Sequence, residues 1–262
     1  MYAMWMKNPQ CILITGASSG IGTALAQYYA APDVILALTG RNQERLDKVC
    51  EQCKEKGAEV HSAILDVINR DAMHSWLIEQ DNKTPFDLVI ANAGISGGTG
   101  GNDLEPFEQV RMIMDINFTG LLNTVEPLLP SFVSRGKGQI ALMSSLASFS
   151  GWPGAPAYSS SKGAVRFYGE SMRGNLAKLG VEMNVICPGF IRTPMTDVND
   201  YPMPFMMDAD KAALIIAKGL EKNKGRIAFP WQTFALAGFF GMLPHFISSW
   251  IFNKLPEKPS SM

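Results

Sequence analysis

The sequence predicts one doubly wound α/β domain, in which a parallel sheet of about seven strands carries helices on both faces. Three observations lead to this fold class. Short, nearly continuous apolar runs alternate with helical stretches, as is typical of strands buried on both faces of a parallel sheet. Small or polar residues follow these runs, at the edge where such sheets bind ligands. The 262 residues, 47% of them hydrophobic and 18% charged, suit one large globular domain.

In the first part of the chain, predicted strands, turns and helices follow one another in a regular order. Apolar runs predict strands, and the more polar stretches with helical spacing between them predict helices. The expected order is a strand at 11–15, a helix at 23–30, a strand at 34–39, a helix at 42–57 and a strand at 59–65. Gly57 ends the second helix at a position where glycine is favoured.

The same order continues through the rest of the chain. A helix at 70–80 and a strand at 87–94 come first, and strands at 139–145 and 182–189 each follow a long helix, at about 105–134 and 156–180. No internal repeat and no linker interrupts this order. A single domain is therefore expected, rather than two.

Charge and cysteine content exclude several classes of function. With 23 Lys and Arg against 24 Asp and Glu, no basic excess is available for a phosphate backbone, and we expect no nucleic-acid partner. Four cysteines are too few for a disulfide scaffold, so free thiols in a reducing compartment are expected. The three histidines lack metal-ligand spacing, and no metal site is predicted.

A glycine-rich turn follows the first predicted strand. Thr15–Gly22 reads TGASSGIG, and its glycines allow a tight turn and a close approach of the backbone to a pyrophosphate. The helix that follows presents amide donors and a partial positive charge. This position favours a dinucleotide site over a structural turn. The candidate residues are Gly16, Ser18, Ser19, Gly20, Ile21 and Gly22.

Tyr158 and Lys162 are four residues apart at the start of a predicted helix, so they share one face. An ammonium beside a phenol stabilises the phenolate and lowers the pKa of the tyrosine, which can then act as an acid or a base. Ser145 ends a predicted strand, where its hydroxyl can donate to a substrate oxygen. Alone, this spacing would indicate a surface helix pair, and only its combination with the other motifs changes that interpretation.

These motifs together resemble the short-chain dehydrogenase/reductase family in its compact, single-domain form. The resemblance runs from about residue 10 to about residue 229 and implies a Rossmann-type fold. It rests on TGASSGIG at 15–22, NAG at 92–94, Asn117, Ser145, Tyr158, Lys162 and PGFIRT at 188–193. Residues 1–229 are accordingly assigned to a dinucleotide-binding and catalytic domain. Residues 230–262 are assigned to an apolar extension of the same domain.

The resemblance implies four catalytic residues. Tyr158 would protonate a carbonyl oxygen in reduction or act as the base in oxidation. Lys162 would hold the nicotinamide ribose and lower the pKa of the tyrosine. Ser145 would position and polarise the carbonyl. Asn117 would hold a water that links Lys162 to solvent.

The resemblance also implies how the cofactor is held. Asn92 and Gly94 would line its adenine side, Asp66 would meet the adenine ring, and Thr193 would bond the nicotinamide carboxamide. The remaining cofactor-binding candidates are Val67, Ala93, Pro188, Gly189 and Ile191, with Pro188 and Gly189 facing the nicotinamide.

The end of the second strand indicates which nicotinamide is preferred. NAD sites usually carry an acidic residue there for the ribose 2′-hydroxyl. Here Gly40 takes that position and Arg41 follows, so a guanidinium is available for a 2′-phosphate. NADP(H) is therefore predicted as the preferred cofactor, and NAD(H) stays open. Ser18 and Ser19 supply no second basic residue within the glycine turn.

The C-terminal segment 227–252 contains no charged residue. It exceeds the length of about 18 apolar residues that suggests a membrane span, but Pro230 and Pro244 interrupt it. Three interpretations stay open: packing over the pocket or at a subunit interface, lying in a membrane interface with Lys254 and Lys258 at its edge, or spanning a bilayer. The first ten residues lack the pattern of a secretory signal, so a cytoplasmic protein is expected, with peripheral membrane contact left open.

Residues 194–208 are the expected lid over the substrate. The segment contains four methionines, Met195, Met203, Met206 and Met207, whose flexible side chains suit an adaptable apolar pocket; packing against the core is an equal alternative. A hydrophobic substrate is therefore expected.

The leading function is an NADP(H)-dependent enzyme that interconverts a carbonyl and a secondary alcohol. A 3-oxoacyl thioester reductase shares the same residues and stays open. A non-catalytic nucleotide-binding protein is disfavoured because Tyr158 and Lys162 are both present. The resemblance further implies a homodimer or homotetramer built on the long helices at about 105–134 and 156–180.

Overall fold

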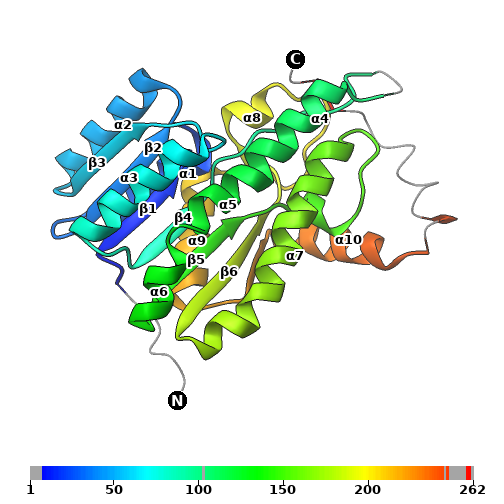
Figure 1. Cartoon of the computed structure of the whole chain (residues 1–262). Helices are drawn as coiled ribbons and strands as arrows, with labels where there is room; N and C mark the ends of the chain where they lie inside the picture. The colour runs from blue at the N-terminus through cyan, green and yellow to red at the C-terminus, as the bar shows by residue number, and fades with distance from the viewer. Residues whose placement is uncertain (1–7, 102–103, 245, 248–257, 261–262) are drawn as a thin grey trace.

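Seven parallel strands form one sheet in the computed structural model, which describes residues 8–101, 104–244, 246–247 and 258–260 (Figure 1). Their order is β3-β2-β1-β4-β5-β6-β9. The strands are β1 (Cys11–Thr15), β2 (Ile35–Gly40), β3 (Glu59–Ile64), β4 (Leu88–Ala91), β5 (Gly138–Met143), β6 (Val181–Pro188) and β9 (Arg226–Phe229). The predicted fold class is confirmed.

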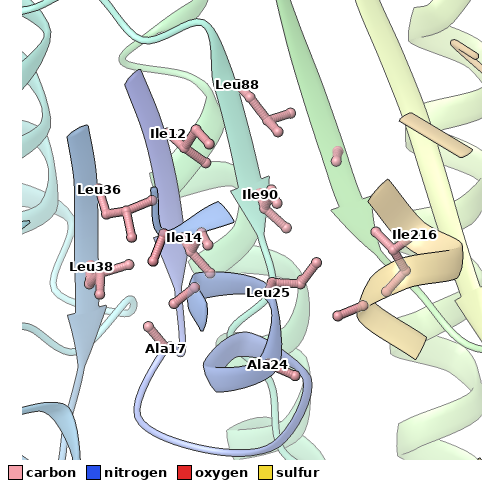
Figure 2. Packing of buried hydrophobic residues seen from close by; sticks show 14 of the residues in the cluster. Ile12, Ile14, Ala17, Ala24, Leu25, Leu36, Leu38, Leu88, Ile90 and Ile216 are labelled. Atoms are coloured by element: carbon pink, nitrogen blue, oxygen red, sulfur yellow. The ribbon is translucent and has the colours of Figure 1, made fainter. Parts of the chain in front are cut away.

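Helices pack against both faces of this sheet, because successive residues of each strand point to opposite sides. In β1, Ile12 and Ile14 belong to one core, and Cys11 and Leu13 belong to the other. The first core is built with α1 (Gly20–Tyr29), α2 (Gln43–Glu55) and α9 (Ala209–Glu221), and the second with α3 (Arg70–Lys83), α5 (Gly120–Val125) and α7 (Pro156–Lys178). Figure 2 shows Ile14 with Leu25 of α1 and Ile216 of α9 in the first core.

The helix predicted over 105–134 is broken into several pieces. They are α4 (Phe107–Met114), a π-helical turn η1 (Asp115–Thr119), α5, and α6 (Leu129–Arg135). The π turn contains Asn117, whose side chain bonds the backbone of Ile95 instead of facing solvent. Such turns often occur at functional sites. A proline in the first turn of α6 favours a new helix start there.

Two short strands join the ends of the segment that is expected to form a lid. Strands β7 (Ile191–Arg192) and β8 (Met207–Asp208) pair with each other, and the short helix α8 (Pro194–Asp197) lies between them in the chain. Of the four methionines, Met195 lines the main cavity and Met207 packs against the first core. Met207 therefore packs against the core, whereas a lid that closes over substrate stays a prediction.

The C-terminal helix α10 (Trp231–Met242) packs against the 3-10 turn η2 (Leu146–Phe149) and against β9, which precedes it in the chain. Phe234 packs against the small cluster around Leu146, whereas Trp231 and Met242 are exposed. Among the described helices, none is long and apolar enough to cross a membrane. Packing and interfacial contact both fit α10, and residues 245 and 248–252 lie outside the described part of the chain.

Candidate active site

A cavity of about 320 Å³ opens at the carboxyl ends of the strands. Strand order reverses on the two sides of β1, and sheets of this kind bind ligands beside that reversal. Most of the predicted site residues line this cavity: Gly16, Ser18, Ser19, Gly20, Ile21, Arg41, Asp66, Val67, Asn92, Ala93, Gly94, Ser145, Tyr158, Lys162, Pro188, Gly189, Ile191 and Thr193. Gly22 and Asn117 do not line the cavity. They lie next to residues that do, Gly22 beside Asn92 and Asn117 beside Ile95.

The glycine turn requires glycine for two separate reasons. Gly16 has a φ of 66°, a left-handed conformation that side chains disfavour. A Cβ on Gly22 would overlap the carbonyl oxygen of Gly16 and lie 2.7 Å from the Asn92 side chain. The Asn92 amide donates to the Thr15 carbonyl oxygen at 2.9 Å, which ties the turn to the end of β4. The sequence pattern of the turn thus corresponds to a close-packed backbone.

The site has the features that a dinucleotide requires. Gly20 begins α1 and lines the cavity, as does Gly16 four residues earlier, so the N-terminus of a helix with free amide donors borders the cavity. The Thr39 hydroxyl is buried at the cavity and has no hydrogen-bond partner among the described residues. Lys162 donates to the Met143 carbonyl oxygen at 3.0 Å, its one hydrogen bond to a described residue. An ammonium has three donors, so two remain for a ligand.

Tyr158 and Ser145 meet at one end of the cavity. Tyr158 lies in the first turn of α7, and Ser145 precedes η2 and accepts a hydrogen bond from the Ala147 amide at 3.1 Å. Burial raises the pKa of Tyr158, and a hydrogen bond with the Ser145 side chain opposes this effect. The two hydroxyls are therefore close enough to bind one substrate oxygen together.

Lys162 lies next to this pair and is 4% exposed. Its ammonium is 5.9 Å from the centroid of the Tyr158 ring. Burial lowers the pKa of Lys162 to about 8. We expected the lysine to lower the pKa of Tyr158, but in this arrangement burial dominates and the pKa of the phenol is raised. The role of Lys162 in lowering the pKa of Tyr158 stays a prediction.

Asn117 holds the loop after β4 beside Lys162. Its side-chain oxygen accepts from the Ile95 amide at 2.8 Å, and its side-chain nitrogen donates to the Ile95 carbonyl at 2.9 Å and to the Ser161 hydroxyl at 3.0 Å. A Cβ on Gly94 would lie 3.0 Å from Asn117 and 3.1 Å from Lys162. Asn117 is thus beside the lysine, and its role in holding a water stays a prediction.

Two guanidinium groups lie at the other end of the cavity. Arg41 forms an exposed ion pair with Asp66 at 3.7 Å. Arg45, in the first turn of α2, also lines the cavity and was missed by the sequence analysis. The sequence could have indicated Arg45, because the first turn of a helix that follows a strand lies at the carboxyl edge of the sheet, where the cavity is. A side chain at Gly40 would lie 2.8 Å from the Ser18 hydroxyl, which explains the glycine there.

Aromatic residues gather beside Tyr158. The ring of Tyr201 makes edge contacts with Trp152 and Phe190, at centroid distances of 5.7 Å and 6.3 Å. Burial, followed by repulsion from Tyr158, raises the pKa of Tyr201 to about 12. Tyr201 was not among the predicted site residues, because nothing in its local sequence shows that the segment folds back toward α7.

Comparisons with known proteins agree with this geometry. The family model for short chain dehydrogenase matches residues 10–201. An uncharacterized oxidoreductase of Myxococcus xanthus is 38% identical over 221 residues, which cover 84% of this chain and 87% of the relative.

Solved structures have the same fold. A short-chain dehydrogenase from Sphingobium yanoikuyae in complex with NADPH gives a TM-score of 0.77 at 24% identity, covering 90% of this chain and 96% of that one. A 3-oxoacyl-[acyl-carrier protein] reductase with bound NAD from Brucella melitensis gives a TM-score of 0.70 at 26% identity, covering 84% and 87%. The family match spans most of the chain and includes the glycine turn, Tyr158 and Lys162. The chain therefore belongs to the short-chain dehydrogenase/reductase family and is an NAD(P)-dependent oxidoreductase of that family.

Proposed function

We propose that this protein interconverts an apolar carbonyl compound and its secondary alcohol with NADP(H) as the cofactor. The observation that carries this proposal is the group of Tyr158, Ser145 and Lys162 at one end of the cavity. When bound, the nicotinamide supplies the hydride in reduction or accepts it in oxidation. The chain itself must hold the carbonyl and move one proton.

Tyr158 and Ser145 divide that work. The Ser145 hydroxyl donates to the carbonyl oxygen and polarises it, as a fixed dipole aimed at developing negative charge. The Tyr158 phenol gives its proton to the same oxygen as the alcohol forms, and the reverse step returns the proton to the phenolate. Lys162 donates to the cofactor ribose with the N–H groups that Met143 leaves available.

The preference for NADP(H) is supported by Arg41 and Arg45. Both line the cavity beside Gly40, and no acidic side chain stands at that position to repel a 2′-phosphate. Guanidinium groups bind phosphate with two parallel hydrogen bonds. Asp66 shares Arg41 through the 3.7 Å ion pair, so a phosphate would compete with that carboxylate.

An apolar substrate is supported by Trp152, Phe190 and Tyr201 beside Tyr158 and by Met195 at the cavity. The same surroundings suit the acyl chain of a 3-oxoacyl thioester, the second candidate. The likeness to the Brucella melitensis reductase favours including it.

The proposal is tested by measuring the oxidation of NADPH, and in parallel of NADH, in the presence of carbonyl substrates. The substrates are aliphatic, aromatic, steroid and 3-oxoacyl thioester carbonyls. We expect turnover with NADPH that is lost in Tyr158→Phe and kept in Tyr168→Phe, a matched change on the same helix. Tight NADPH binding without turnover would call for further substrates or added lipid. An absence of cofactor binding would contradict the proposal.

Contact between copies of the chain, or with a membrane surface, is also part of the proposal. Phe107 of α4 and Phe167 of α7 are 73% and 62% exposed, which supports a homodimer or homotetramer built on these helices. Trp231 and Met242 of α10 are 73% and 81% exposed, which supports contact with a further apolar surface. Light scattering and vesicle flotation of the purified protein test the two contacts separately.

A further inference from the structure

The end of the chain returns to the active site. Lys258 accepts a hydrogen bond at its carbonyl oxygen from the Gly100 amide at 2.9 Å. Two residues later, the Ser260 hydroxyl donates to the side-chain oxygen of Gln109 at 2.8 Å. Gly100 belongs to the loop after β4 and Gln109 to α4. Residues 258–260, hereafter the tail, are therefore fastened to two segments that border the site.

A chain of hydrogen bonds connects the tail to the residue beside Tyr158. The Gln109 side-chain amide donates to Glu105 at 2.6 Å. The other carboxylate oxygen of Glu105 accepts from the Ala157 amide, in the first turn of α7, at 2.9 Å. Gln109 and Glu105 are both buried. The position of the tail is thus coupled to the start of the helix that carries Tyr158.

Two glycines leave room for the tail. A Cβ on Gly98 would lie 2.5 Å from the Cβ of Lys258, and one on Gly100 would lie 3.1 Å from the Cβ of Ser260. Gly100 also has a φ of 66°, which disfavours a side chain in itself. The glycines of this loop are therefore matched to the tail, and the contact depends on them.

The Lys258 ammonium lies over the catalytic tyrosine. Its Nζ is 5.3 Å from the centroid of the Tyr158 ring, and the residue is 7% exposed. Among the residues that the structure describes, no carboxylate lies within ion-pair distance of this nitrogen. In one of the three open interpretations of the C-terminal segment, Lys258 lay at the edge of a membrane interface; the structure instead buries this lysine beside Tyr158.

A buried ammonium without a negative partner is costly. Burial lowers the pKa of Lys258 to about 8, because a charge removed from water loses solvation that only a partner can restore. Other donors near Tyr158 are also unsatisfied. The Trp152 indole nitrogen and the Tyr201 hydroxyl are buried with no hydrogen-bond partner among the described residues. An indole nitrogen can only donate and a phenol can donate, so each of these two groups could bond an acceptor on a ligand.

We propose that Lys258 is a specificity-determining residue, whose ammonium binds an anionic group of the substrate beside the ring of Tyr158. The inference rests on the proposed carbonyl chemistry and narrows the substrate class to apolar carbonyl compounds that carry a carboxylate or a phosphate. Such a group supplies the negative charge and the acceptors that Lys258 and its neighbours lack. The proton transfer by Tyr158 is unaltered by this assignment.

Matched substrates test the assignment. The kcat/KM for reduction with NADPH is measured for straight-chain methyl ketones that end in a carboxylate and for their methyl esters, over graded chain lengths. The wild type is expected to prefer the acid at least about tenfold, the value of one charge-assisted hydrogen bond. The ratio of acid to ester falls to about one in Lys258→Met and stays high in Lys258→Arg. Lys222→Met, which removes an exposed lysine just after the end of α9, is the control and keeps the ratio of the wild type.

Binding separates this inference from the proposed reaction. Calorimetry compares an alkyl carboxylate, the matching alkyl phosphate and the matching alcohol on the NADP⁺-loaded protein, for the wild type and Lys258→Met. Tighter binding of one anion identifies its class, provided that the advantage disappears in Lys258→Met. Equal binding of all three ligands, or an advantage that survives the substitution, would overturn the assignment. A wild type that reduces no ketone would contradict the proposed reaction, while the binding comparison would still decide the role of Lys258.

Discussion

Two buried ammonium groups lie near the ring of Tyr158, Lys162 at 5.9 Å and Lys258 at 5.3 Å. Burial lowers the pKa of each to about 8. An ammonium in such a position favours the ionised phenol, but here it reaches that position at a cost in folding stability. Functional sites often lower the free energy of unfolding in this way, because the groups that bind a ligand are not fully satisfied in its absence.

Lys258→Met is expected to stabilise the protein. The folded-state pKa of about 8 lies below the ordinary value of 10.5, so the penalty is complete below about pH 8 and disappears as the pH rises through 10.5. The free energy of unfolding should therefore rise by about 1–3 kcal/mol at neutral pH. Thermal unfolding at neutral pH and at about pH 10 measures this gain. A lower melting temperature for Lys258→Met at neutral pH would show that the lysine has a structural role.

Arg41→Asp should change cofactor preference. The substitution places a carboxylate beside the expected 2′-phosphate, and we expect KM for NADPH to rise at least about tenfold more than KM for NADH. Arg70→Asp, an exposed change at the start of α3 outside the cavity, is the control. Equal effects of Arg41→Asp on the two cofactors would contradict the assignment.

At the scale of elements, Gly22→Ala tests the packing of the glycine turn. The added methyl group would overlap the Gly16 carbonyl, so we expect a loss of about 1–3 kcal/mol in the free energy of unfolding and weaker NADPH binding. Gly174→Ala, in α7, meets nothing within 4 Å and should gain about 0.5–1 kcal/mol. Denaturant midpoints and NADPH titration measure both variants. A Gly22→Ala protein as stable as Gly174→Ala would contradict the close-packed turn.

Local patterns predicted most of the elements correctly. Strands β1, β2, β4, β5 and β6 follow apolar runs, which buried parallel strands require on both faces, whereas the edge strand β3 is more polar and only partly buried. The strand β9 was not delineated, because its apolar residues continue directly into the uncharged segment of α10. The break at η1 was missed because the hydrogen bonds between Asn117 and Ile95 join residues that are distant in the sequence.

The candidate site was predicted where a motif marked it, and missed where only tertiary contact creates it. Tyr158, Lys162 and the glycine turn have fixed spacings, and the structure brings them to one cavity. Tyr201 and Lys258 have no such spacing and reach the site through the fold of loops and the tail. Lys258 contacts Tyr158 across 100 positions of sequence. Such a contact is created by tertiary packing, and local sequence patterns do not indicate it.

At the scale of the whole molecule, Phe167→Asp tests the proposed assembly. Phe167 is 62% exposed on α7, and a carboxylate there would be costly to bury at an interface between copies. We expect the mass in solution to fall to that of a monomer. Leu214→Asp, on α9 at the other face of the sheet, is the matched control. Light scattering gives the mass, and a mass unaffected by Phe167→Asp would exclude this interface.

In the proposed reaction a hydride passes between a nicotinamide and a carbonyl, with Tyr158 as the proton donor. The most direct measurement follows deuterium from labelled NADPH into the alcohol product by mass spectrometry. We expect one deuterium on the carbinol carbon with the wild type, and no labelled alcohol from Tyr158→Phe, although this variant still binds NADPH. Labelled alcohol formed at the wild-type rate by Tyr158→Phe would contradict the proposed role of Tyr158.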